Sequence, residues 1–174
     1  DSIKNCPRNL LRIAGEIVSS RDIFNTVMKN ERILKNGGVT FSGGEPLMQS
    51  EFLIECLKLF KYRLHTAVQT CGYCESNTFK KVLDLSDYFL YDLKIIDDTL
   101  HKKHTGVSNK TIINNFKTLA KSSKDFVVRI PLIPGVTDTV SNITDIATLL
   151  KDNNVFYAEI MPYNKMAGGK YSMI

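Results

Sequence analysis

The feature that most constrains the fold is a repeated alternation of two kinds of segment. Stretches with apolar residues at helical spacing are each followed by a short β-prone run. Strands that alternate with helices through short loops form right-handed units around a parallel sheet. The predicted helix and strand pairs are residues 19–34 with 39–42, 51–62 with 65–70, 76–83 with 88–94, 111–121 with 126–132, and 142–151 with 156–162.

The number of predicted strands limits the architecture. Five strands are too few to close an eight-stranded barrel. We therefore expect an α/β fold in which the parallel strands form a curved, open, partial (β/α) barrel, with a flat doubly wound sheet as the alternative. In either architecture the active edge is formed by the carboxyl ends of the strands.

Composition excludes several classes of function. The net charge is +5, but the lysines lie singly or in pairs without a basic run, so we expect a solvated lysine surface and no nucleic-acid partner. The apolar runs are too short to span a bilayer and the N-terminus lacks a signal-peptide pattern, which predicts a cytoplasmic protein without membrane attachment. The 4 cysteines are spread unevenly, which favours reduced thiols over a disulfide framework.

The most informative turn is Gly43-Gly44-Glu45-Pro46, directly after the first predicted strand. Two glycines allow a sharp turn and a close approach of the backbone to a ligand, while Glu45 offers an anionic acceptor that suits an ammonium group. An ordinary strand-to-helix turn with a solvated glutamate has the same local pattern. The turn alone therefore does not decide the function.

A second informative pair is Asp92 and Lys94, which lie two residues apart on a predicted strand. Their side chains should project from one face, where Lys94 can reach a carboxylate. The same pair could cap the strand, and an isolated strand lysine could also form a Schiff base.

Several segments together resemble a known family. Residues 39–47 are similar to the Gly-Gly-Glu segment of radical S-adenosylmethionine (SAM) enzymes, and in particular of the activating enzymes for pyruvate formate-lyase and related glycyl-radical enzymes. The segments that continue the resemblance, in the family's order, are Thr70-Cys71-Gly72-Tyr73, Tyr91-Asp92-Leu93-Lys94, Thr105-Gly106-Val107-Ser108-Asn109, residues 129–138 and Met161-Pro162-Tyr163. The resemblance therefore covers nearly all of the chain.

The resemblance implies an oxidoreductase that cleaves SAM reductively to a 5′-deoxyadenosyl radical and installs a glycyl radical on a partner such as pyruvate formate-lyase. It also implies a flavodoxin or a ferredoxin-type protein as electron donor. Two alternatives stay open, which are another radical SAM enzyme acting on a small molecule and a non-catalytic α/β module that binds a ligand or a partner.

The resemblance assigns roles to individual residues. Glu45 would accept from the SAM ammonium, and Lys94 would bind the SAM carboxylate. Gln69 stands at a ribose-binding position, although it could be a strand glutamine satisfied by backbone, and Arg129 would bind the SAM carboxylate or the partner's backbone unless it forms a structural ion pair. Asn164 replaces a histidine of the pyruvate formate-lyase activator, so it keeps hydrogen bonding but not titration. The predicted SAM-binding residues are Gly43, Gly44, Glu45, Gln69, Asp92, Lys94, Arg129 and Asn164.

The family holds a [4Fe–4S] cluster on a Cys-x3-Cys-x2-Cys loop, which this sequence lacks. We therefore expect a fragment in which residues 1–18 are the remnant of a ferredoxin-like insertion or linker and residues 19–174 are a partial barrel core. The first strand, the cluster loop and the family's C-terminal region would be missing. Cys6 would be the last ligand of an auxiliary cluster, and the chain alone should neither hold a [4Fe–4S] cluster nor cleave SAM.

The remaining metal-like patterns are weaker. Cys71 and Cys74 have the spacing of a zinc or redox pair, but no second pair completes a tetrahedral site, so we predict a structural role. His101 and His104 lie three apart, as on one helical turn, where a solvated or capping role is expected.

Overall fold

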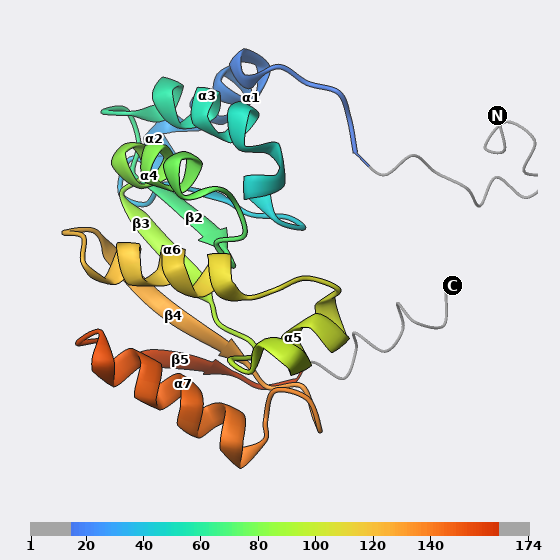
Figure 1. The fold of residues 1–174 in the computed structure, drawn as a ribbon. Coiled ribbons are helices and arrows are strands. Elements are labelled where there is room, and N and C mark those ends of the chain that lie inside the picture. The colour runs from blue at the N-terminus through green and yellow to red at the C-terminus, as the bar shows by residue number, and fades with distance from the viewer. Residues whose placement is uncertain (1–14, 164–174) are drawn as a thin grey trace, which may run out of the picture.

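A computed structural model of the chain describes residues 15–163. Its elements follow the predicted alternation of helices and strands (Figure 1). The helices are α1 (Ser20–Met28), α2 (Glu31–Leu34), the 3-10 helix η1 (Pro46–Gln49), α3 (Ser50–Phe60), α4 (Ser76–Leu85), α5 (Asp98–Thr105), α6 (Lys110–Ala120) and α7 (Val140–Asp152). The strands are β1 (Val39–Phe41), β2 (Thr66–Thr70), β3 (Tyr88–Asp92), β4 (Asp125–Pro131) and β5 (Ala158–Met161).

The strands form one sheet of 5 parallel strands in the order of the sequence, β1-β2-β3-β4-β5. The sheet is open, because within residues 15–163 β1 and β5 each pair on one side alone. This arrangement confirms the predicted α/β fold with an unclosed, partial barrel. Because every pairing is parallel, all five strands run toward the same end of the molecule, as Figure 1 shows for the labelled strands β2 to β5.

The hydrophobic core lies between one face of the sheet and the helices α3, α4, α6 and α7. Val68, Phe89 and Tyr91 alternate with less buried neighbours along β2 and β3, and these three side chains and Val128 on β4 are fully buried. Aromatic side chains join the layers, and the rings of Tyr91 and Phe116 lie 5.8 Å apart. Burial of these apolar side chains is the main force that holds the helices on the sheet.

The structure differs from the prediction in three places. The expected helix over residues 19–34 is divided into α1 and α2, because Asn30 leaves helical geometry and its carbonyl accepts from Ile33 and Leu34. Helix α5 extends the single helical turn that was expected around His101 and His104 to residues 98–105. Strand β3 ends at Asp92, so Lys94 lies just beyond the strand.

Within residues 15–163, no helix combines the length and the apolar character that a membrane crossing requires. The boundary predicted between residues 18 and 19 stays a prediction.

Candidate functional site

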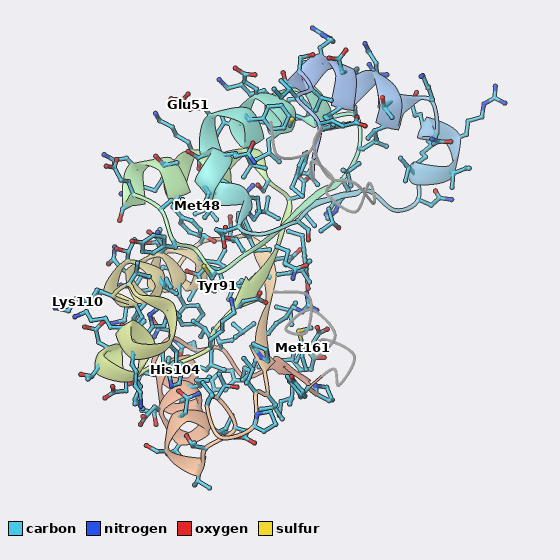
Figure 2. All side chains as sticks on the ribbon, turned by 90° about the vertical axis from the view of Figure 1, so that its right-hand side faces the viewer. Met48, Glu51, Tyr91, His104, Lys110 and Met161 are labelled. Carbon is cyan, nitrogen blue, oxygen red and sulfur yellow. The ribbon has the colours of Figure 1, made fainter. Side chains whose placement is uncertain are left out.

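The carboxyl ends of β1, β2 and β3 border a cavity of about 170 Å³. Glu45 comes from the turn after β1, Cys71 from the residue after β2, and Asp92 and Lys94 from the end of β3. Figure 2 looks onto this end of the molecule and labels Met48, which also lines the cavity, and Tyr91, which belongs to the neighbouring hydrophobic core. Glu45 of the Gly-Gly-Glu turn and Lys94 thus both line a cavity at the carboxyl end of the sheet.

The Glu45 carboxylate already accepts several hydrogen bonds from the protein. Its Oε1 accepts from the Leu47 backbone N–H at 3.1 Å and from the Thr70 hydroxyl at 2.5 Å, and its Oε2 accepts from the Cys71 backbone N–H at 2.8 Å. A carboxylate offers about four acceptor positions, so capacity for a ligand donor remains. Glu45 therefore ties the β1 turn to the end of β2, which is a structural role that the sequence did not predict.

The two glycines before Glu45 leave open space above the turn. No atom lies within 4 Å of the position that a Cβ would occupy at Gly43 or at Gly44, and Gly43 has φ +133°. The backbone at this turn is therefore free to be approached by a ligand. Gly72 differs, because φ is +76° and a Cβ there would lie 1.9 Å from the Tyr91 hydroxyl.

Asp92 and Lys94 form a loose pair at the end of β3. The Lys94 Nζ lies 4.0 Å from the Asp92 Oδ2, with the lysine side chain 40% exposed and the aspartate 18%. Asp92 Oδ1 is buried and has no hydrogen-bond partner, and burial raises the pKa of this carboxyl against the lowering effect of Lys94 and Arg129. An unpaired buried oxygen is costly, which makes Asp92 a candidate for ligand contact.

Gln69 and Arg129 lie on the same face of the sheet as Asp92 but are not among the residues that line the cavity. The Gln69 side-chain oxygen accepts weakly from the Ser42 hydroxyl at 3.4 Å. Arg129 pairs in register with Asp92, and its Nε lies 3.7 Å from Glu159 Oε2 without a hydrogen bond. The ion-pair alternative for Arg129 is therefore present in the structure. Asn164 and Cys6 lie outside the described residues.

Cys71 and Cys74 follow β2 and are partly buried. Burial, helped by the nearby Glu45, raises the pKa of Cys71 to about 11 and that of Cys74 to about 12. Thiols with raised pKa values are poor metal ligands at neutral pH, because the thiolate binds the metal. These values support the predicted structural role of the pair.

His101 is buried at 4% exposure, so the solvated role, one of the two that were expected, does not apply to it. Its Nδ1 lies 2.8 Å from the carbonyl oxygen of Val107 and must carry the proton, since a carbonyl only accepts. The side chain thereby fastens α5 to the turn that follows it. His104 is exposed.

Sequence reasoning missed three buried asparagines on or next to helices, Asn109, Asn115 and Asn142. Asn115 on α6 donates to the carbonyls of Gly72 and Cys74 at 2.8 and 2.9 Å, so it fastens the turn that supplies the Cys71 N–H to Glu45. An available signal was the position of Asn115 beside Phe116 on the apolar side of α6, where an unpaired amide would be unfavourable.

The residues at the cavity fit one of the two groups that the resemblance implies. Glu45, Asp92 and Lys94 match the ammonium and the carboxylate of the methionine part of SAM. A [4Fe–4S] cluster does not fit, because residues 15–163 contain no group of three His, Cys, Asp or Glu side chains that could hold a metal.

Comparison with known proteins gives the family. The family model described as the Radical SAM superfamily matches residues 5–147. The 4-hydroxyphenylacetate decarboxylase activating enzyme of Clostridioides difficile (strain 630) is 32% identical over 100% of this chain and 56% of its own length, and the isethionate sulfite-lyase activating enzyme of Nitratidesulfovibrio vulgaris is 35% identical over 97% and 56%. The chain thus spans about half the length of these curated relatives.

A solved structure shows the same likeness. The crystal structure of a domain of pyruvate-formate lyase-activating enzyme from Bacteroides vulgatus matches with a TM-score of 0.64 and 36% identity over 75% of this chain and 83% of that one. The resemblance to glycyl-radical enzyme activating enzymes is thereby confirmed. The chain belongs to the Radical SAM superfamily.

Proposed function

We propose that this chain forms the SAM-binding core of an activating enzyme for a glycyl-radical enzyme. The observation that carries the proposal is the convergence of Glu45, Asp92 and Lys94 on one cavity at the carboxyl ends of three adjacent strands. The names of the relatives and the match of segments along the whole chain support the activating-enzyme class.

In this proposal, Lys94 pairs with the carboxylate of SAM. Its ammonium is partly exposed, and within residues 15–163 its ion pair is the 4.0 Å contact with Asp92, so little must be broken for it to turn to a ligand. A charge-assisted hydrogen bond of this kind contributes about 1.5–3 kcal/mol. Gly43 and Gly44 leave room for the ligand beside the turn.

The opposite end of the methionine moiety is an ammonium, which needs acceptors. Glu45 retains acceptor capacity beyond its three protein hydrogen bonds. Asp92 Oδ1 accepts no hydrogen bond from the protein. A bound ammonium would give the buried Asp92 oxygen a partner. Gln69, Arg129 and Asn164 belong to the proposal as contacts to ribose, carboxylate or partner backbone, and to the adenosyl group.

The chemistry of the complete protein is part of the same proposal. Reductive cleavage of SAM to methionine and a 5′-deoxyadenosyl radical would be followed by removal of a hydrogen atom from a glycine of the partner. The residues described here would bind and orient SAM, since none of them forms a site for an iron–sulfur cluster. A flavodoxin or ferredoxin-type donor would supply the electron.

The partner enzyme is the finer part of the proposal. Relatives are named for activating 4-hydroxyphenylacetate decarboxylase, isethionate sulfite-lyase, trans-4-hydroxy-L-proline dehydratase and choline trimethylamine-lyase. Pyruvate formate-lyase is a further candidate, through the domain from Bacteroides vulgatus. These names differ in the enzyme that is activated.

The test compares this chain with the complete gene product. Both are treated anaerobically with iron, sulfide and a reductant, and are then assayed for bound iron and for 5′-deoxyadenosine formed from SAM. We expect the complete product to form 5′-deoxyadenosine and this chain to form none. Absence of 5′-deoxyadenosine from an iron-loaded complete product would contradict the proposal, and stoichiometric iron on this chain would reassign Cys71 and Cys74 as ligands.

A further inference from the structure

The segment that carries Lys94 has no regular secondary structure of its own. Residues 93–96 follow β3 and precede α5, outside any helix or strand. Leu93 is still attached to the sheet, because its N–H donates to the Arg129 carbonyl at 3.0 Å. Beyond that bond the backbone must be held by other groups.

Two buried asparagine side chains hold it. The Asn142 Nδ2 donates to the Lys94 carbonyl at 2.8 Å, and its Oδ1 accepts from the Ile96 N–H at 3.0 Å. From the other side the Asn109 Nδ2 donates to the carbonyls of Ile95 and Ile96 at 3.0 and 2.7 Å. Both asparagines are almost fully buried, at 5% and 2% exposure.

The amide group suits this task better than other side chains. Asn142 uses its acceptor and both donors, since Nδ2 also donates to the Thr137 carbonyl at 2.9 Å. Aspartate would lose the donors and place a charge against two carbonyls, and leucine of similar size would leave all three backbone groups unpaired. The Lys94 backbone is thus specified by side chains that come from α7 and from the start of α6.

We infer that Asn142 and Asn109 are positioning residues that fix Lys94 for the SAM carboxylate. The inference rests on the proposed function. It gives a role to Asn109 of the Thr-Gly-Val-Ser-Asn segment and to the start of α7 after the Pro-Gly-Val-Thr-Asp segment. Lys94 has a flexible, 40% exposed side chain, so the direction of its ammonium depends on where the backbone places its Cα.

The experiment measures SAM affinity by equilibrium dialysis on the iron-loaded complete gene product. We expect Asn142→Ala to weaken SAM binding about tenfold, because one or two of the hydrogen bonds that hold the Lys94 backbone are lost. In a Lys94→Ala background the same change should weaken binding less than about twofold, because a residue that acts through Lys94 has nothing left to position. Ile146→Val, a buried change on the same helix outside the segment, is the control for lost stability and should leave affinity unchanged.

A second readout is independent of binding. Hydrogen exchange in this chain should show loss of protection at the Ile96 amide in Asn142→Ala and retained protection in Ile146→Val. If Asn142→Ala does not fold, Asn109→Ala takes its place, with weaker SAM binding that again requires Lys94.

The outcomes separate the inference from the proposed function. Unchanged SAM affinity in Lys94→Ala would overturn the assignment of Lys94 and with it both claims. A loss in Lys94→Ala without a loss in either asparagine variant would overturn the inference alone. Equal losses from Asn142→Ala with and without Lys94 would also overturn it, since the asparagine would then act on the fold as a whole.

Discussion

The two faces of the sheet are built from the same strands but obey different rules. On the face that packs against the helices, Val68, Phe89 and Tyr91 are fully buried. On the other face, Gln69, Asp92 and Arg129 occupy the alternate positions near the strand ends, and buried polar atoms of Asp92 and Arg129 lack hydrogen bonds. The helix-covered face is formed mainly by packed apolar side chains, with the buried Asn115 Oδ1 on α6 as an unpaired exception, whereas the other face keeps polar side chains of its own strands unsatisfied at a cost in stability.

This difference teaches where function can be expected in such a fold. Packing satisfies an apolar side chain completely, so the helix-covered face has little left with which to bind a ligand. An unpaired buried polar group calls for an explanation, and a ligand that pairs with it is one such explanation. The predictions below test the contrast from the largest expected effect to the smallest.

The largest effect is expected on the packed face. Phe89→Ala removes a fully buried ring from the core and should lower the free energy of unfolding by about 3–5 kcal/mol. Leu90→Ala, one residue later on the opposite and less buried face, should cost about 1 kcal/mol. Denaturant titration of both variants measures the contrast, and equal losses would show that the two faces contribute alike.

Next in size is Lys94→Ala, on the ligand-binding side of the contrast. In the iron-loaded complete gene product it should weaken SAM binding by about 1.5–3 kcal/mol through loss of a charge-assisted hydrogen bond. The free energy of unfolding should change by less than about 0.5 kcal/mol, because the side chain is 40% exposed. Lys103→Ala, an exposed lysine on α5, is the matched control. A stability loss as large as the affinity loss would make Lys94 a structural residue.

A smaller effect of opposite sign is expected from Asp92→Asn. Burial raises the pKa of Asp92 in the folded state, so the aspartate supports the fold when protonated and loses that support as pH rises through its folded pKa. The variant should therefore match the native chain near pH 3 and exceed its stability by roughly 0.5–1 kcal/mol at neutral pH. Denaturation midpoints of the variant and of the native chain between pH 3 and pH 8 measure this difference in stability. A native chain that is the more stable at pH 7 would contradict the cost assigned to the unpaired carboxylate.

The packed face was the more predictable from sequence. Apolar periodicity located the main helices and short β-prone runs located the five strands, because packing of helices on a sheet selects those two kinds of segment. The divided first helix, the start of α5 and the end of β3 before Lys94 depend on single hydrogen-bonded turns, for which periodicity carries no signal. Residues that belong to the cavity, Glu45 and Lys94, came from the resemblance to a family and from their charge.

The supports of the site could not be predicted in the same way. The hydrogen bond from Thr70 to Glu45 depends on how β1 and β2 are placed side by side. The hydrogen bonds from Asn109 and Asn142 to residues 94–96 join positions up to 48 residues apart. Such contacts are made by the tertiary fold. A trace of them is visible only as polar residues in otherwise apolar helix faces, as with Asn115 and Asn142.

The smallest effect is expected at Cys71 and Cys74, which lie where the two regions meet. Burial raises the pKa of Cys71 to about 11 and of Cys74 to about 12, so both thiols are almost entirely protonated at pH 8. Alkylation by iodoacetamide should be slow at pH 8 and should still accelerate above pH 10, whereas a free thiol levels off near its ordinary pKa. Cys56, buried on α3, serves as an internal comparison.

Metal content of the purified chain should be the same with and without Cys74→Ser, because two protonated thiols supply at most half of a tetrahedral site. Stoichiometric zinc or iron that disappears with Cys74→Ser would show instead that the pair is a metal site. The ligand-binding region would then include the residues that follow β2.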